Sequence, residues 1–235
     1  MEGYSCCTIR IFSADSHRFN RFWPERQTGN EEYYTIKGFS KSIADFLKKI
    51  GIEKNKISII GHLLGDYIAL QMAIENKEMI EKLVLVDSSG LLEGPTPLLE
   101  EYLDAAMETA EELRIKKLEK VIGNMYADPS YMPPVVVSKF NEIIKQEGAR
   151  YAFEKAFHNS TTTKIEAQGF MQIQDIPCLI IWGAKDKVIP IDYFEKFKEE
   201  DKLPEAMYER IEDVGHAPFV ERTALVYEKI RTFLN

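Results

Sequence analysis

The chain has 235 residues, of which 45% are apolar and 29% charged, as in ordinary globular proteins. Its net charge of −8 and its isoelectric point near 5.2 exclude a nucleic-acid surface, because phosphate binding requires a clustered basic face. The sequence contains no apolar run of about 18 residues, so no membrane-spanning helix is expected.

The N-terminal residues and the cysteines bear on the compartment. The stretch MEGYSCCTIRIFSAD lacks the basic segment and apolar core of a signal peptide. Cys6 and Cys7 are adjacent, and Cys178 lies in an apolar run, where it is expected to be a small core residue. Such a sparse, odd set favours a reducing compartment, so we expect a cytoplasmic protein without disulfides, metal or cofactor.

Five segments are predicted as strands. Four short apolar runs lie at residues 7–14, 57–61, 83–88 and 178–183, and a more polar fifth strand is expected within residues 206–214. Continuous runs of Ile, Val and Leu are typical of strands that are covered on both faces, as in parallel sheets.

Helical periodicity fills the intervals between these strands. Phe39, Ile43, Phe46, Leu47 and Ile50 form one apolar stripe, and Gly51 is placed to end that helix at C′. Further stripes lie at residues 68–73 and 226–234. The alternation of strand and helix predicts an α/β fold with a mostly parallel sheet flanked by helices.

Residues 91–165 interrupt this alternation. One apolar stripe is expected to run along a single helix through Leu99, Leu103, Ala106, Ala110 and Leu113. The proline-rich stretch ADPSYMPP breaks the pattern, and the residues from 135 to 159 are again helical in character. We therefore expect a core formed by residues 1–90 and 166–235, with residues 91–165 as a helical cap over the edge of the sheet where ligands bind.

Three loops, each following a predicted strand, carry chemically notable residues. The first is Gly61-His62-Leu63-Leu64-Gly65, which stands between a strand and a helix. The second, WGAKDKVIP, contains Asp186, and the third, VGHAPFVE, contains His216.

With this set of loops the chain resembles the α/β-hydrolase superfamily, especially its capped esterases and carbon–carbon bond hydrolases. In that family a nucleophile on a G-x-S-x-G turn, an acid and a histidine follow one another along the chain. The resemblance implies that Asp186 orients His216, that His216 acts as general base, and that the backbone N–H of Leu64 is an oxyanion donor. It further implies that a small apolar or ester-like substrate contacts residues beside the elbow and in the cap, namely His62, Tyr126, Met132 and Phe157.

The sequence departs from the family pattern at three places. Leu63 holds the nucleophile position, and an aliphatic side chain cannot form an acyl-enzyme. Asp66 replaces a residue that is usually small, and we expect it to be structural or exposed. Upstream, Asp15 fits the family, but Arg18 and Asn20 occupy glycine positions.

The elbow and the upstream residues are the first two places, and the third is the start of the chain. Residues 7–14 resemble the fourth family strand, which implies an N-terminal truncation that removes three strands and a His-Gly loop. The segment 7–14 is then expected to move beside residues 57–61 as an edge strand.

Three functions remain open on these grounds. The chain can be an impaired or inactive hydrolase that binds a small molecule, or an active hydrolase or lyase that uses the Asp186–His216 pair as general base. It can also be a hydrolase whose nucleophile has moved to Ser88 or Ser89, although these residues are more typical of a turn. Nucleic-acid and membrane partners are not expected, and the oligomeric state stays open.

Overall fold

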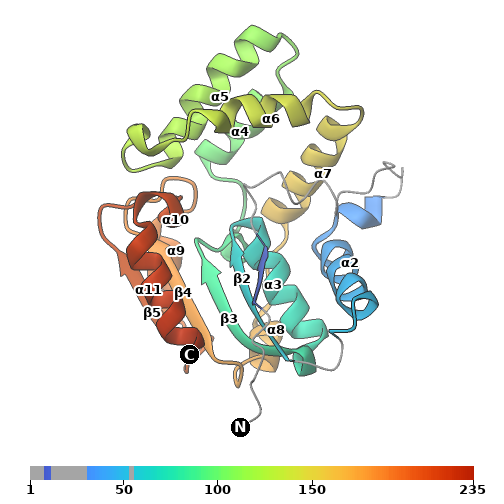
Figure 1. The fold of residues 1–235 in the computed structure, drawn as a ribbon, viewed down its shortest axis with the longest axis vertical. Helices are drawn as coiled ribbons and strands as arrows, with labels where there is room; N and C mark the ends of the chain where they lie inside the picture. Colours follow the sequence, from blue (N-terminus) through green and yellow to red (C-terminus); the bar gives the residue numbers. More distant parts are fainter. Residues whose placement is uncertain (1–7, 12–30, 53–55) are drawn as a thin grey trace.

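The computed structural model describes the backbone of residues 8–11 and, with their side chains, residues 31–52 and 56–235. Within these residues the fold is a five-stranded parallel sheet of order β1-β2-β3-β4-β5, with helices on both sides (Figure 1). The strands are β1 (Thr8–Ile11), β2 (Ile57–His62), β3 (Ile80–Val86), β4 (Cys178–Gly183) and β5 (Met207–Ile211). The predicted α/β class and the predicted strands at residues 57–61 and 178–183 and within 206–214 are confirmed. The strand predicted at 83–88 is present but begins earlier, at Ile80, and ends at Val86.

The position of β1 also agrees with the sequence prediction. It pairs in parallel with β2, with Thr8 opposite Ser58, and stands at one end of the sheet formed by the described residues. The other residues of the predicted strand 7–14 lie outside the described part of the chain, as do Cys6, Asp15, Arg18 and Asn20.

Alternate residues along the strands enter two separate cores, which explains their continuous apolar sequences. Ile59, Leu85 and Ile180 pack on one side with α2 (Ile36–Lys49), α3 (Leu64–Glu75), α8 (Ala167–Gln172) and α9 (Ile191–Glu199). Ile60, Val84 and Ile181 pack on the other side with α11 (Thr223–Leu234). Strands β2, β3 and β4 are therefore buried on both faces.

Helix α2 ends as its sequence predicts. Gly51 has φ +81°, its N–H donates to Lys48 O, and the N–H of Ile52 donates to Leu47 O. These bonds satisfy carbonyls at the helix end, and glycine adopts this left-handed conformation without a Cβ clash.

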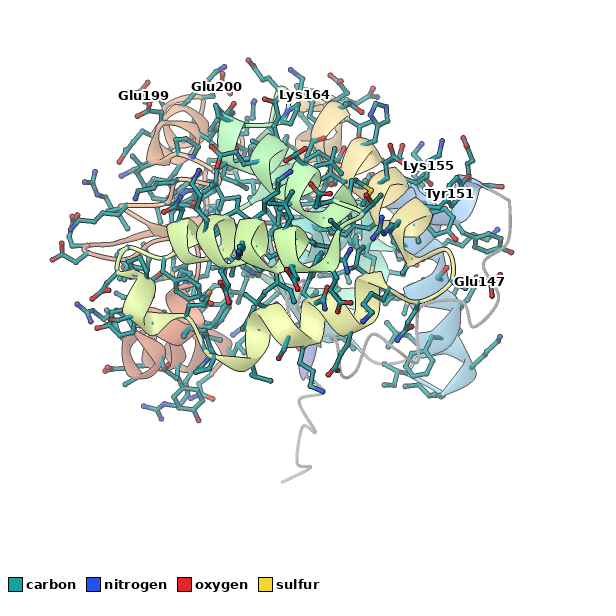
Figure 2. All side chains as sticks on the ribbon, turned by 90° about the horizontal axis from the view of Figure 1, so that it is seen from above. Glu147, Tyr151, Lys155, Lys164, Glu199 and Glu200 are labelled. Atoms are coloured by element: carbon teal, nitrogen blue, oxygen red, sulfur yellow. The ribbon has the colours of Figure 1, made fainter. Side chains whose placement is uncertain are left out.

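Residues 91–165, which lie between β3 and β4 and are here called the insert, cover the carboxyl ends of the strands (Figure 1). The insert contains α4 (Pro97–Met107), α5 (Glu111–Met125), the short 3₁₀ helix η4 (Pro129–Tyr131), α6 (Val135–Ile144) and α7 (Ala149–Thr162). Seen from above, Tyr151 and Lys155 of α7 point toward the 3₁₀ helix η1 (Glu31–Tyr34), where Lys155 Nζ lies 2.6 Å from Glu31 Oε1 (Figure 2).

The prediction of a single helix from Leu99 to Leu113 is wrong. The chain leaves the helical conformation at Glu108, whose ψ is 128°, and Leu113 is 46% exposed. The break is stabilised by hydrogen bonds that cannot be recognised from apolar spacing. Glu108 Oε1 accepts from the N–H of Ala110, and the buried guanidinium of Arg114 donates to the carbonyl oxygens of Glu108 and Thr109.

Among the described residues, no helix combines the length and the apolar character that crossing a bilayer requires.

Candidate active site

The turn between β2 and α3 keeps the geometry of a nucleophile elbow although its central residue is leucine. Leu63 has φ 52° and ψ −117°, a region that a residue with a side chain rarely adopts. At the end of β2, a Cβ on Gly61 would lie 2.5 Å from the backbone nitrogen of Asp66, so only glycine fits there. The strained turn therefore persists without the reactive atom that it normally presents.

Hydrogen bonds from neighbouring strands fix this turn. The N–H of Leu63 donates to Val86 O at 3.2 Å, and the hydroxyl of Ser89 donates to Leu63 O at 2.9 Å. Leu63 is also the N-cap of α3 and provides no side-chain cap bond, so Leu64 begins a helix whose first N–H groups have no intrahelical partner. Such N–H groups suit an oxyanion or another acceptor.

Asp186 and His216 meet at the carboxyl ends of β4 and β5. Nδ1 of His216 lies 2.7 Å from Oδ2 of Asp186, while the other carboxylate oxygen accepts the N–H groups of Val188 and Ile189 at 2.7 and 3.0 Å. This arrangement places the imidazole proton on Nδ1 and leaves the lone pair on Nε2. That Nε2 is buried and has no hydrogen-bond partner among the described residues.

Burial controls the protonation of this pair. It lowers the pKa of His216 to about 3, although the charge of Glu221 acts in the opposite direction, so the imidazole is neutral at physiological pH. Burial likewise raises the pKa of Asp186, and the two backbone N–H donors oppose that rise. A neutral histidine with a free Nε2 can accept a proton or a hydrogen bond.

A second buried histidine lies against the first. The ring centroids of His62 and His216 are 4.7 Å apart, and Nε2 of His62 lies 2.8 Å from His216 O, to which it donates. Burial lowers the pKa of His62 to about 3. Asp87, whose Oδ2 lies 3.7 Å from the same Nε2, is fully buried and accepts the N–H of Gly183 at 2.9 Å. Burial raises the pKa of Asp87, and the neighbouring charge of Asp186 raises it further.

His62, Asp87 and His216 are also the described residues that come closest to a metal-binding set. Their ligand atoms lie within 4.8 Å of one another, and two imidazoles with a carboxylate are ligands that Zn²⁺ accepts. However, Nε2 of His62 carries the hydrogen that it donates to His216 O, so this nitrogen has no lone pair for a metal. The expectation that no metal is bound stays a prediction.

Asp66, on the first turn of α3, is fully buried, so the part of the prediction that allowed it to be exposed is wrong. Its Oδ1 accepts the hydroxyl of Ser88 at 2.5 Å, while Oδ2 has no partner among the described residues. Burial raises the pKa of Asp66 well above its ordinary value. Because the hydroxyls of Ser88 and Ser89 are both engaged, the former with Asp66 and the latter with Leu63 O, neither has the geometry of a relocated nucleophile.

The residues predicted to contact substrate are spread over several elements. His62 is bonded to the His216 loop, and Tyr126, which is 7% exposed, ends α5 above that loop. Met132 and Phe157 are half-buried and pack against the main core. The structure thus brings His62 together with His216 and places the other three residues in the insert.

Glu221 has a part in this site that the sequence reasoning missed. It is 4% exposed, and its carboxylate accepts N–H groups on both sides of His216 as well as one from the insert. The available signal was an acid five residues after His216, at the end of the one-turn helix α10 (Pro218–Glu221). Acids are so common in exposed helices that this signal is weak.

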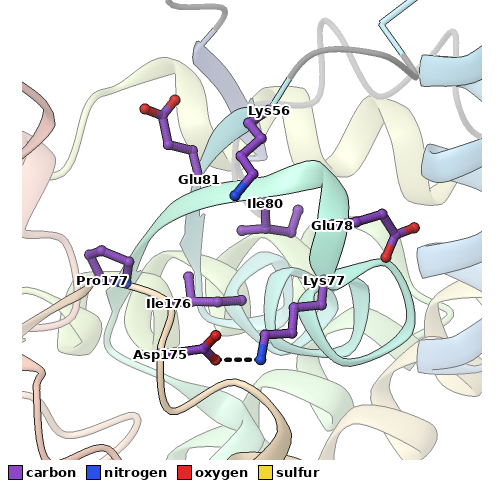
Figure 3. Close-up of a pocket in the computed structure, with 8 residues that line it drawn as sticks. All are labelled: Lys56, Lys77, Glu78, Ile80, Glu81, Asp175, Ile176 and Pro177. Atoms are coloured by element: carbon purple, nitrogen blue, oxygen red, sulfur yellow. Dashed lines mark ion pairs between the residues drawn. The ribbon is translucent and has the colours of Figure 1, made fainter.

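A separate pocket of about 380 Å³ lies at the opposite, amino end of the sheet (Figure 3). Lys77 and Asp175 form an ion pair across it, and Ile80, Ile176 and Pro177 form its apolar wall. It is remote from the carboxyl ends of the strands, where Asp186 and His216 lie.

Comparisons with known proteins agree with this geometry. The family model described as alpha/beta hydrolase fold matches residues 17–223. Lipase 1 of Psychrobacter immobilis is 29% identical over 81% of this chain, and the chain spans 60% of that lipase. A 2-hydroxy-6-oxononadienedioate/2-hydroxy-6-oxononatrienedioate hydrolase of a Pseudomonas species is 23% identical over 78% of this chain and 62% of its own length.

Solved structures show the same fold. A mutant meta-cleavage product hydrolase from Pseudomonas fluorescens IP01, complexed with acetates, superposes with a TM-score of 0.73 at 19% identity, covering 91% of this chain and 74% of that one. From the elbow, the order of the acid and the histidine, and the match of the family model, we conclude that the chain belongs to the alpha/beta hydrolase fold family.

Proposed function

We propose that this chain is a hydrolase-family protein that no longer performs nucleophilic serine catalysis and instead binds a small apolar molecule with a carboxyl or ester group. The observation that carries the proposal is Leu63 in the elbow conformation, where the nucleophile belongs. A leucine side chain has neither a lone pair nor an acidic proton, so it cannot form the acyl-enzyme.

The polar groups around Leu63 favour a ligand that both accepts and donates hydrogen bonds. The first N–H groups of α3 are donors, and the buried Nε2 of His216 is an acceptor. A carboxylic acid in its protonated form offers the complementary pair, a carbonyl oxygen and a hydroxyl. The acetates in the mutant meta-cleavage product hydrolase provide a parallel from a protein of the same fold.

The insert is the natural source of the apolar part of this site. We infer that residues 91–165 act as a cap, with Tyr126, Met132 and Phe157 beside the ligand. Tyr102, Phe140 and Phe153 support this role, since their ring centroids lie 5.4 to 5.5 Å apart and form an aromatic cluster within the insert.

A fluorophosphonate probe tests the loss of the nucleophile. The wild-type protein should remain unlabelled, whereas Leu63→Ser should become labelled, because its hydroxyl would occupy the elbow beside a neutral imidazole. Leu64→Ser is the matched control: it makes the same chemical change one residue later and should stay unlabelled. Stoichiometric labelling of the wild-type protein would show that another nucleophile is present.

Ligand binding is tested separately with octanoic acid. A ligand at one hundred times its Kd should stabilise the folded protein by about 2.7 kcal/mol, which is visible as a rise in Tm. His216→Ala should abolish that rise, because it removes the acceptor. A rise of the same size in His216→Ala would place the ligand elsewhere.

A second function is favoured by the intact Asp186–His216 pair. A neutral imidazole with a free Nε2 can accept a proton from a water molecule, but a pKa of about 3 makes it a weak base, so the acceleration should lie at or below the low end of the about 10² to 10⁴-fold that general-base catalysis typically contributes. This function predicts release of nitrophenol from short acyl esters by the wild-type protein and its loss in His216→Ala. A wild-type rate equal to that of His216→Ala would exclude it.

A further inference from the structure

The loop that carries His216 is joined to the insert through the buried carboxylate of Glu221. Oε1 of Glu221 accepts the N–H of Gly215 at 2.9 Å and that of Ala217 at 3.3 Å, the two residues that flank His216. Its other oxygen, Oε2, accepts the N–H of Ala127 in the insert at 2.8 Å. One side chain thus satisfies donors from two segments that are about ninety residues apart in sequence.

The two backbones are also in direct contact. The N–H of His216 donates to Met125 O at 2.7 Å. A Cβ on Gly215 would lie 2.5 Å from both Ala127 N and Met125 O, so even a methyl group does not fit between the loop and the insert.

On its other side the His216 loop packs against the loop of Asp186. A Cβ on Gly183 would clash with Gly215 O and would lie 2.7 Å from Val214 O. The N–H of Lys185 donates to Val214 O at 2.8 Å. Residues 125–127, 214–217 and 183–186 therefore form three adjoining layers of backbone, which we call the seam.

We propose that Glu221 is a positioning residue that holds the insert and His216 together as one unit, so that residues 125–127 cannot separate from the core without displacing the imidazole. Hydrogen bonds from N–H groups to a carboxylate are stronger than those between neutral groups, and the Glu221 side chain that accepts all three is buried. This inference requires neither a bound ligand nor a reaction, so it can be tested whether or not the proposed function holds.

Hydrogen exchange of the wild-type protein gives the first test. The amides of Ala127, Gly215 and His216 should exchange with one common free energy of opening, because the seam opens as a unit. If Ala127 exchanged more than tenfold faster than Gly215 and His216, the insert would open independently and the proposal would fail.

Variants of Glu221 give the second test. In Glu221→Gln the amide oxygen can still accept some of these N–H groups, whereas Glu221→Ala leaves all three without a partner. We expect exchange at Ala127 and Gly215 to accelerate at least tenfold in Glu221→Ala and less in Glu221→Gln. Glu209→Gln, which removes a carboxylate of β5 that is paired with Lys229 of α11, is the matched control and should leave these amides unchanged.

The proton resonance of the His216 imidazole distinguishes a positioning role of Glu221 from a general contribution to stability. Its Nδ1 proton, shared with Asp186, should give a far-downfield proton resonance in the wild-type protein and in Glu209→Gln, and should shift or broaden in the Glu221 variants. A merely structural role would lower Tm and leave this resonance in place, which would overturn the proposal. If neither Glu221 variant folds, the exchange of the wild-type amides still decides between the two outcomes.

Discussion

Leu63 has the backbone conformation of a nucleophile elbow but no nucleophilic side chain. Backbone conformations of this kind cost on the order of 1–3 kcal/mol and persist only where the surroundings enforce them. Here the bonds from Leu63 to Val86 and Ser89, and the contact between Gly61 and α3, enforce the turn. The scaffold of the elbow therefore does not depend on the identity of its central side chain.

The contact at Gly61 gives a prediction at this scale. In Gly61→Ala the added methyl group would press on the backbone of α3, and since backbone cannot yield as a side chain can, we expect a loss of about 3 kcal/mol or more in unfolding free energy. Urea denaturation measures the loss. Gly94→Ala is the control, because a Cβ there meets nothing within 4 Å and should change stability little.

Different interactions stabilise the strands and the insert. Strands β2, β3 and β4 are fixed by apolar contacts on both faces. The turn between α4 and α5 is held by a buried cation: Arg114, 2% exposed, donates to Asn141 on α6 and to the carbonyls of Glu108 and Thr109. Arg150 of α7 adds bonds to Met107 O and Glu108 O. The insert is thus organised by polar groups in its interior.

Arg114→Met should for this reason destabilise the insert. The substitution keeps most of the apolar stem but leaves Asn141 Oδ1 and the carbonyl of Thr109 without a donor, which costs about 2–4 kcal/mol. The carbonyl of Glu108 keeps its bond from Arg150. Thermal unfolding monitors the change, and Lys116→Met, on an exposed position of α5, serves as control. Equal Tm values for the two variants would refute the role assigned to Arg114.

The end of α2 gives a smaller effect at the same scale. Gly51→Ala meets no atom within 4 Å, so its effect is confined to the backbone conformation at φ +81°. We expect a loss of about 1 kcal/mol, measured by chemical denaturation. A neutral or stabilising substitution would contradict the left-handed conformation at Gly51.

For the molecule as a whole, buried titratable groups make stability depend on pH. The pKa of Asp66 is raised on folding, so its contribution is fully present below the unfolded value of 3.8 and is lost as the pH rises toward the folded pKa. The histidines act in the opposite direction. The pKa values of His62 and His216 fall from 6.5 to about 3, so their contribution is present above pH 6.5 and is lost as the pH falls.

Asp66→Asn isolates the first of these effects. The amide oxygen still accepts the hydroxyl of Ser88, but the group no longer ionises. The variant should match the wild-type protein near pH 4 and become the more stable of the two as the pH rises, by up to about 1.4 kcal/mol per pH unit below the folded pKa. Urea denaturation at pH 4, 6 and 8 measures this difference, and a constant difference would show that Asp66 is not buried as a neutral acid.

The amino-acid sequence by itself determined the α/β class, the buried strands at residues 57–61, 83–88 and 178–183, the more polar strand within residues 206–214, the helix that ends at Gly51, and the order of elbow, acid and histidine. These features depend on the spacing of apolar residues and on the positions of glycines. Both can be recognised within short stretches of the sequence. The placement of β1 beside β2 also followed from the resemblance to the family.

Only the tertiary structure decided the break after Glu108, the burial of Asp66 against Ser88, the second histidine beside His216, and the part taken by Glu221. Each of these depends on hydrogen-bond partners that lie far apart in sequence or on side chains that stabilise a local break in the helix. Desolvation of the two histidines and three aspartates likewise arises only when packing removes water from all of them together.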